Sequence, residues 1–178
     1  MEEQHLWLGG TDGYDTYRIP AQAVTSEGTV LAFCEGRVNG SSDTGDIDML
    51  VKRSTDGGAI WSDQQVIWND GANTCGNPAP VVDEESGVIS LLMTWNRGDD
   101  EERKIIAQTS KDTRHVFVSR SEDDGLSWSD PEEITDDAKQ PDWTWYATGP
   151  GAGIQVQHGH HAGPLVVACD HIESGNDH

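Results

Sequence analysis

A short acidic loop is the first place where this sequence could carry chemistry. Residues 41–48 read Ser-Ser-Asp-Thr-Gly-Asp-Ile-Asp and offer three carboxylates, at Asp43, Asp46 and Asp48. A carboxyl group can protonate a leaving group and then activate water as a general base. In a chain this acidic, however, three loop carboxylates are more simply explained as solvated surface groups. The residues alone therefore do not identify a catalytic acid.

Two arginines lie at the expected ends of strands, and each could bind an anionic group. Arg18 lies in the segment Tyr17-Arg18-Ile19-Pro20, and Arg37 ends the segment Phe33-Cys34-Glu35-Gly36-Arg37. A planar guanidinium grips a carboxylate through two parallel hydrogen bonds. Glu35 shares a strand face with Arg37, since side chains two residues apart point the same way. Glu35 could therefore orient either arginine by an ion pair. The alternative is that Arg18 is a surface residue in an ordinary ion pair.

The charge of the chain excludes some partners. Its 178 residues contain 11 Lys and Arg against 32 Asp and Glu, which gives a formal net charge of −21. Such a surface repels nucleic acids and anionic membranes, so we expect no nucleic-acid partner. No stretch approaches the roughly 20 apolar residues that cross a bilayer, so we expect no membrane span. The first residues, Met1-Glu2-Glu3-Gln4, lack the apolar region of a signal peptide, and the compartment stays unknown.

Two sets of potential metal ligands are better explained without a metal. The three histidines His158, His160 and His161 lie in a glycine-rich turn. Cys34, Cys75 and Cys169 match no zinc spacing and are too few for a disulfide framework. We expect the three cysteines to be small buried hydrophobic residues and predict neither a metal nor a cofactor.

The elements that must position these residues are short strands. Glycines and polar clusters separate runs of alternating or β-branched residues, and no window of 11 residues or more keeps a helical period. The pattern indicates a β-sandwich, barrel or propeller. The runs expected to be strands are 29–34, 47–53, 80–82 with 88–95, 104–109 with 115–120, and 154–157 with 165–169.

A repeated turn decides among these architectures. The pattern Ser-x-Asp-x-Gly-x-x-Trp occurs at 54–61 and again at 121–128, and Ser-Asp follows both copies. Its Ser and Asp side chains can bind turn amides, its Gly can adopt a positive φ, and its Trp can pack over the turn. We therefore assign these residues to structure and not to catalysis, and the repetition favours a propeller. The positions are Ser54, Asp56, Gly58 and Trp61, and then Ser121, Asp123, Gly125 and Trp128.

The turn resembles the Asp-box of bacterial neuraminidases, and further segments narrow the resemblance to the exo-α-sialidases. The segments 17–20 and 33–37 resemble the YRIP and F-x-E-x-R motifs of that family, and 148–155 resembles its TGPG-x-GIQ motif. The resemblance implies a six-bladed β-propeller that hydrolyses terminal sialic acid with retention of configuration. It also implies that residues 1–178 are the N-terminal part of the propeller domain, about its first three blades. Members of the family are usually secreted, periplasmic or cell-surface proteins.

The resemblance assigns roles to individual residues. Arg18 matches one of three arginines that bind the sialic acid carboxylate, and Arg37 matches the arginine near the 4-hydroxyl group of the sugar. Counting back from Lys52-Arg53, Asp43 matches the acid/base, with Asp46 as the runner-up. Asp48 falls within the expected strand and more simply bonds a neighbour. Glu35 would orient the arginines.

Two further segments match the walls of the family's sugar pocket. Asn77, in the segment 76–80, matches a residue that could bond a hydroxyl group, although an Asn-Pro turn explains it as well. Ala147 and the aromatic residues before it match the region beside the N-acetyl and glycerol groups, although Trp-rich segments are more often core. Asp170 and His171 would lie near the glycerol tail.

Parts of the family's active site have no match in this chain. The nucleophile is a tyrosine activated by a glutamate, and Tyr14, Tyr17 and Tyr146 do not match it. No match for the other two clamp arginines is found. We therefore expect an N-terminal fragment that is inactive alone and that self-associates through open sheet edges. The partners would be sialylated glycans. The alternative is a non-catalytic glycan-binding or structural module.

Overall fold

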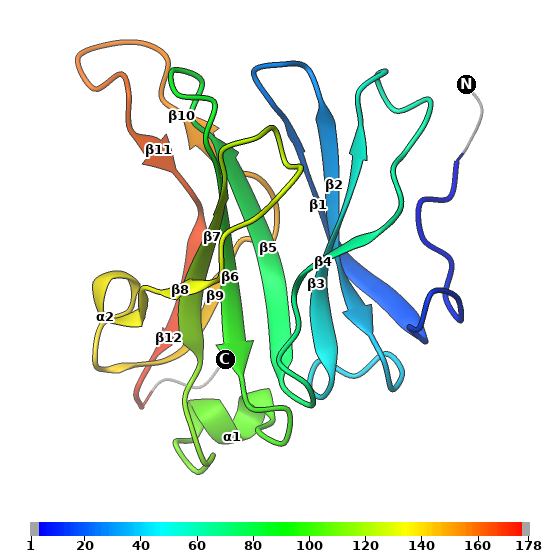
Figure 1. The fold of residues 1–178 in the computed structure, drawn as a ribbon. Helices are drawn as coiled ribbons and strands as arrows, with labels where there is room; N and C mark the ends of the chain where they lie inside the picture. The colour runs from blue at the N-terminus through cyan, green and yellow to red at the C-terminus, as the bar shows by residue number, and fades with distance from the viewer. Residues whose placement is uncertain (1–3, 176–178) are drawn as a thin grey trace.

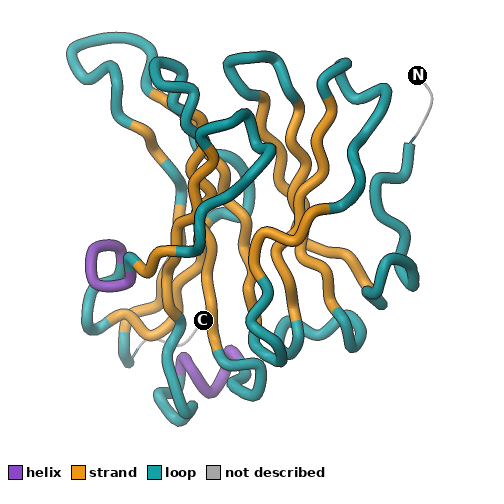
Figure 2. Tube along the Cα trace, in the orientation of Figure 1, coloured by secondary structure: helices purple, strands orange, loops and turns teal. Residues whose placement is uncertain are grey.

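The computed structural model describes residues 4–175 as an all-β chain, as the sequence predicts. Alternating and β-branched runs form strands, and glycine or polar clusters form the turns between them. Figures 1 and 2 show the strands running up and down the molecule, with loops at both ends. The strands are β1 (Thr16–Val24), β2 (Val30–Arg37), β3 (Ile47–Ser54), β4 (Gln65–Trp68), β5 (Thr74–Val82), β6 (Ile89–Asn96), β7 (His115–Ser121), β8 (Glu132–Glu133), β9 (Trp143–Thr148), β10 (Ile154–Gln155), β11 (Leu165–Val166) and β12 (Cys169–Glu173).

The strands form successive antiparallel groups. In the first, β2 pairs with β1 and β3, and β4 pairs with β3. In the second, β5, β6, β7 and β8 pair in sequence order. The two groups touch through one parallel pairing, between Ile47 of β3 and Thr74 of β5. The third comprises the pairs β9–β12 and β10–β11. The arrangement is that of consecutive propeller blades, and Figure 1 shows the first group beside the second.

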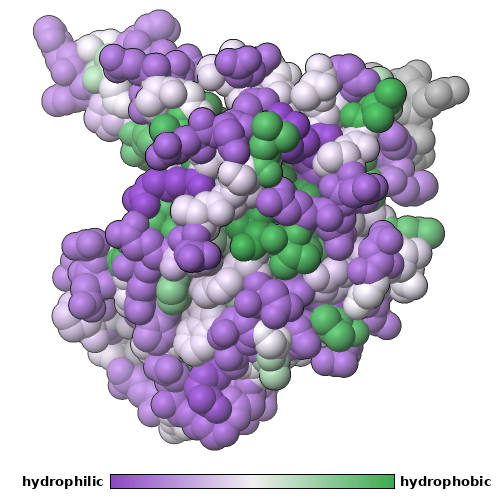
Figure 3. Space-filling model, viewed as in Figure 1, coloured by the Kyte–Doolittle hydropathy of each residue, from purple (hydrophilic) through white to green (hydrophobic). Residues whose placement is uncertain are grey.

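The main core lies between the first two blades. Apolar side chains alternate along the strands and fill the space between the sheets. Trp128 of the second repeated turn packs edge-on against Phe33, with ring centres 5.7 Å apart. The buried cluster is Ala21, Leu31, Phe33, Met49, Val51, Ile89, Leu91 and Met93. The solvent-facing surface in Figure 3 is mainly hydrophilic, in line with the acidic composition.

The first repeated turn is built from its own side chains. Asp56 Oδ1 accepts hydrogen bonds from the backbone amides of Ala59, at 3.0 Å, and Ile60, at 2.9 Å, and from Ser54 Oγ at 2.8 Å. Ser54 Oγ in turn accepts from the Gly58 amide at 2.8 Å. The carboxylate is thus occupied by the turn and does not face a cavity.

The second repeated turn makes the same local bonds and adds a contact to the first blade. Asp123 Oδ1 accepts from Ser121 Oγ and the Ser127 amide. The next residue, Asp124, reaches across to the first blade. It accepts from Thr25 Oγ1 and Thr29 Oγ1, both at 2.5 Å, and from Arg53 Nη2 at 2.6 Å. In the first turn the equivalent residue is Gly57, which has no side chain to make such a link.

The strand expected at 104–109 was a wrong prediction. Residues Glu102–Ile106 form the short helix α1, and β7 pairs with β6 instead. Lys104 binds Glu101 at 2.7 Å, a spacing of three residues that suits a helical turn. Only Ile105 is buried in this helix, so the segment lacks the alternation that a half-buried strand requires.

The last predicted hairpin is shorter than expected. Residues 154–155 and 165–166 do pair, but residues 169–173 pair with β9 instead. Cys34 and Cys75 are buried free thiols as expected, whereas Cys169 is exposed because it lies on β12 away from the core. The other helix, α2, spans Thr135–Ala138. Within residues 4–175, neither helix has the length or the apolar character needed to cross a membrane.

Candidate active site

Most of the residues that the sequence singled out meet at one cavity. Glu35, Arg37, Asp43, Asn77 and Ala147 all line a hollow of about 220 Å³ between the loop after β2, the start of β5 and strand β9. Arg18 is not part of that lining and joins the group through Asp43. The remaining lining residues are Ile19, Thr74, Glu102, Arg114, Trp145, Pro150 and Asp170.

Arg37 anchors the acidic loop. Its guanidinium is buried and binds Glu35 Oε2 through Nε, at 3.0 Å, and through Nη2, at 2.5 Å. Its Nη1 donates to the carbonyl oxygens of Ser41, at 2.8 Å, and Ser42, at 2.7 Å. Both side chains of the Glu35–Arg37 pair are at most 4% exposed, and their multiple hydrogen bonds offset the cost of burying two charges.

Asp43 is held by both predicted arginines. Its Oδ1 accepts from Arg37 Nη1 at 2.8 Å and from Arg18 Nη1 at 2.7 Å. Its side chain is still 67% exposed. Partial burial raises the pKa of Asp43, but the hydrogen bonds and charges of Arg37 and Arg18 outweigh that effect and hold the pKa below its usual range. Asp43 is therefore ionised near neutral pH in this state.

A strained backbone aims Arg18. The pairing of β1 with β2 shifts between Arg18 and Ala21, so that two residues of β1 lie opposite one residue of β2. One of them, Ile19, has a φ of +55°. A β-branched residue rarely adopts this conformation, and such strain concentrates at functional sites. The irregularity turns the Arg18 side chain toward the acidic loop, where it also binds the Ser41 carbonyl oxygen.

Glu35 also positions Asn77. Its Oε1 accepts from the Asn77 backbone amide at 2.9 Å, while its Oε2 holds Arg37. Asn77 has a φ of +56°. Gly76 permits this approach, because a Cβ atom there would lie 2.5 Å from Glu35 Oε1. Glu35 thus links the first blade to the second at the cavity wall.

Arg114 also lines the cavity, although no motif in the sequence marked it. Its Nε donates to the Tyr146 carbonyl oxygen at 3.0 Å, and its Nη1 donates to Asn96 Oδ1 at 2.5 Å. Its Nη2 donates to Asn77 Oδ1 and to Thr94 Oγ1. Burial lowers the pKa of Arg114 to about 10, although nearby carboxylates favour the charged form.

The two other loop acids face elsewhere. Asp48 lies in β3 and accepts from Tyr14 Oη at 2.6 Å and from Asn69 Nδ2 at 2.8 Å. The pKa of Asp46 is raised by burial and by the charge of Asp48, as a general acid needs, but Asp46 does not line the cavity. Because Asp43 lines the cavity and Asp46 does not, Asp43 remains the stronger candidate for the acid/base.

None of the tyrosines reaches the cavity. Tyr14 bonds Asp48, and Tyr17 Oη donates to the Thr11 carbonyl oxygen at 2.9 Å. Tyr146 is buried in β9, and burial raises its pKa, so its phenol is not activated. In the part of the chain that the structure describes, no cluster of three or more His, Cys, Asp or Glu has the arrangement of a metal site.

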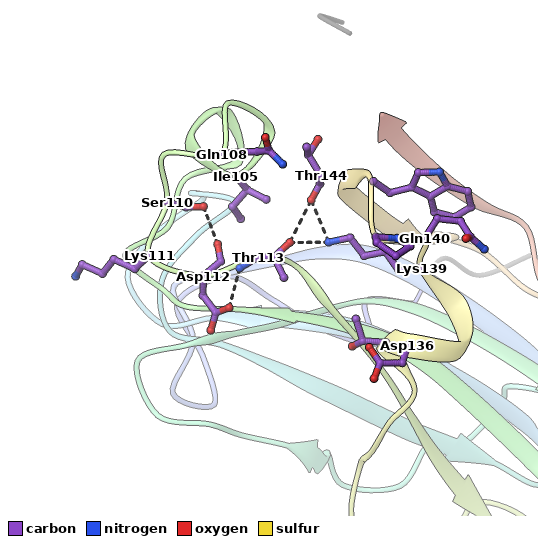
Figure 4. A pocket seen from close by; sticks show the side chains of 13 residues that line it. Ile105, Gln108, Ser110, Lys111, Asp112, Thr113, Asp136, Lys139, Gln140 and Thr144 are labelled. Carbon is purple, nitrogen blue, oxygen red and sulfur yellow. Dashed lines mark hydrogen bonds between the residues drawn. The ribbon is translucent and has the colours of Figure 1, made fainter. Parts of the chain in front are cut away.

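A larger hollow lies beside α1 and α2 and is shown in Figure 4. It measures about 630 Å³, and the buried Lys139 is one of the residues that line it. Lys139 Nζ donates to Thr113 Oγ1 at 2.6 Å, to the Arg114 carbonyl oxygen at 3.0 Å and to the Thr144 carbonyl oxygen at 3.1 Å. With its three N–H groups bonded to the protein, this lysine holds strands together and is not offered to a ligand.

Comparisons with known proteins identify the family of this chain. The BNR repeat-like domain family matches residues 28–177. An exo-alpha-sialidase of Aspergillus fumigatus is 36% identical over 172 residues, which cover 87% of this chain and 41% of that protein. A sialidase of Micromonospora viridifaciens is 35% identical over 171 residues, which cover 92% of this chain and 26% of that protein.

The solved structures give the same result. The Hadza microbial sialidase Hz136 superimposes with a TM-score of 0.82 and 32% identity, over 93% of this chain and 34% of that chain. The chain therefore spans less than half the length of the curated relatives and solved structure described here.

Proposed function

Because the chain belongs to the sialidase family with BNR repeats, we propose that it supplies the acid/base and part of the carboxylate clamp of a retaining exo-α-sialidase. The substrate would be terminal α-linked sialic acid on glycoconjugates. Residues 1–178 would form the N-terminal part of the propeller domain, with Asp-boxes at 54–61 and 121–128. The observation that supports this most is one carboxylate, Asp43, shared by Arg18 and Arg37 at the rim of a cavity.

When the substrate carboxylate replaces the Asp43 carboxylate on Arg18, the protonation state of Asp43 would change. In the structure Arg18 binds Asp43, which keeps that acid ionised. A substrate carboxylate on Arg18 would take over its hydrogen bond and add a negative charge nearby. Both changes raise the pKa of Asp43, so that it can carry the proton that the leaving glycosidic oxygen needs. After donating the proton, Asp43 would activate the incoming water.

The remaining lining residues would orient the sugar. Arg37, held by Glu35, would donate to a hydroxyl group while keeping the acidic loop in place. Asn77 would bond a second hydroxyl from the opposite wall. Ala147, beside Trp145, offers a small apolar surface that suits the methyl part of an N-acetyl group.

Turnover would require groups that these residues do not supply. The family's nucleophile is a tyrosine, and the three tyrosines here lie away from the cavity. A neutral phenol suits this substrate, because a carboxylate nucleophile would meet the sugar's own carboxylate. We therefore propose that the 178 residues alone bind sialic acid but do not cleave a fluorogenic sialoside, whereas a longer form with the missing groups does.

The experiment compares Asp43→Ala with wild type in that longer form. The loss of rate should be larger for natural sialosides than for activated aryl sialosides, because only poor leaving groups need protonation. Asp63→Ala, in an exposed loop after the first Asp-box, is the matched control and should leave both rates unchanged. Equal losses on both substrates would show that a residue other than Asp43 is the acid/base. Robust turnover by the 178 residues would show that catalysis needs no further groups.

A non-catalytic glycan-binding or structural module is the second candidate. The position of the three tyrosines, all outside the cavity, is the observation that favours it. This candidate predicts sialoside binding without hydrolysis in the longer form as well, which the same assay measures.

A further inference from the structure

Arg114 joins three strands around the cavity. Its side chain bonds Asn77 of β5, Thr94 and Asn96 of β6, and the backbone of Tyr146 in β9. One guanidinium, from the residue just before β7, thus ties the cavity wall together.

Burying the guanidinium cation of Arg114 costs free energy, which indicates that Arg114 does more than stabilise the fold. The residue is 3% exposed, and the four acceptors of its hydrogen bonds are uncharged oxygens. Burying a cation is expensive, and apolar side chains of similar volume often serve stability as well or better. A buried cation beside a cavity is therefore best explained by what it does to the groups around that cavity.

The first of these groups is the carboxamide of Asn77. A guanidinium can only donate hydrogen bonds, so the Asn77 atom that it contacts is the carbonyl oxygen Oδ1. Thr94 Oγ1 lies 3.0 Å from the same oxygen. These contacts fix which end of the carboxamide is the oxygen, and they direct the amino end away from Arg114. The rotamer of a lining residue is thereby set by Arg114.

The second group is the indole ring of Trp145. Arg114 Cζ lies 4.1 Å from the centre of that ring, a cation–π contact. Trp145 also lines the cavity, two residues before Ala147. The backbone of Arg114 is itself fixed, since Lys139 donates to its carbonyl oxygen at 3.0 Å.

We propose that Arg114 is a positioning residue of the sugar site, which orients Asn77 on one wall and Trp145 on the other. The inference rests on the proposed function for the identity of the sugar, sialic acid. Arg114 acts through these two side chains, and its positive charge also favours an anionic ligand in an otherwise acidic protein.

The test uses Arg114→Lys, which keeps the charge but cannot bond all of these acceptors at once. Arg120→Lys is the matched control, because Arg120 lies in β7, the strand that directly follows Arg114, and is exposed in a pair with Glu132. Urea unfolding first establishes that each variant is folded. Nitrogen-15 NMR then follows the side-chain amide signals of Asn77, which are identified by their loss in Asn77→Ser.

We expect Arg114→Lys to shift the Asn77 side-chain signals and Arg120→Lys to leave them in place. Arg114→Lys should also weaken binding of free N-acetylneuraminic acid about tenfold, a loss typical of one charge-assisted hydrogen bond. Asn77→Ser should weaken binding by a similar factor. The double variant should bind little worse than either single variant, because both changes remove the same interaction.

Three outcomes separate this inference from the proposed function. Unmoved Asn77 signals in folded Arg114→Lys would overturn the positioning role, whatever the ligand. Losses in affinity that multiply in the double variant would show that Arg114 and Asn77 act independently, and would also overturn it. A wild-type chain that does not bind N-acetylneuraminic acid would count against the proposed function, while the Asn77 signals would still decide the role of Arg114.

Discussion

Asp124 offers a direct test of how the two blades are held together. Its side chain sits at the second Asp-box and binds Thr25, Thr29 and Arg53 of the first blade. The backbone there has a φ of +62°, close to the +76° of Gly57 at the equivalent place in the first box. Asp124→Gly therefore removes the link without straining the turn, and Asp124→Asn keeps the shape while removing the charge.

The expected loss follows from the partial burial of the pair. The side chains of Asp124 and Arg53 are 23% and 16% exposed. Breaking a fully buried ion pair costs about 3–5 kcal/mol, and an exposed one is worth about 0–1 kcal/mol. An intermediate burial gives a loss in the free energy of unfolding of about 2–3 kcal/mol for Asp124→Gly and about 1–2 kcal/mol for Asp124→Asn.

Urea unfolding followed by tryptophan fluorescence measures both losses. Asp99→Asn is the matched control, because Asp99 pairs with Arg97 and Lys111 but is half exposed. We expect the control to change the free energy of unfolding much less than either Asp124 variant, because solvent screens an exposed pair. If Asp124→Gly and Asp124→Asn cost no more than the control, the second Asp-box does not hold the blades together and the reasoning is wrong.

Two further predictions concern pH and assembly. His115 lies between Glu133, at 2.7 Å, and Asp112, at 3.1 Å; burial lowers its pKa, but the hydrogen bonds to these carboxylates outweigh burial and raise it. The stabilisation from the charged imidazole should be present in full below about pH 6.5 and should be lost as the pH rises through the raised pKa of His115. His115→Gln should therefore lower the free energy of unfolding at pH 5.5 and lower it much less at pH 8.5. We also propose that the chain self-associates through its open third group of strands, where Ile154, Leu165 and Val166 are exposed. Light scattering should show a dimer or larger species, and a stable monomer at high concentration would contradict this.

Sequence patterns predicted the features that depend on neighbours along the chain. The Asp-boxes were readable because Ser, Asp and Gly act within five residues, and most strands were readable from their alternation. The site residues Arg18, Arg37 and Asp43 were found through motifs, and the structure brings both arginines within hydrogen-bonding distance of Asp43.

The features that were missed depend on contacts between distant segments. Arg114 meets partners 18 to 37 residues away, which no local pattern marks. The bond from the Asn77 amide to Glu35 spans 42 residues and needs the absence of a side chain at Gly76. The segment at 104–109 was misread because a short apolar run does not distinguish a strand from a helical turn.

We propose that a sialic acid carboxylate competes with Asp43 for Arg18. The most direct test is the pKa of Asp43, measured by carbon-13 NMR of its carboxyl group with and without saturating N-acetylneuraminic acid. We predict a pKa below the ordinary range in the free chain, because Arg37 and Arg18 hold the ionised form. We predict a rise when the ligand binds. A pKa that is already ordinary in the free chain, or that stays unchanged at saturation, would contradict the claim.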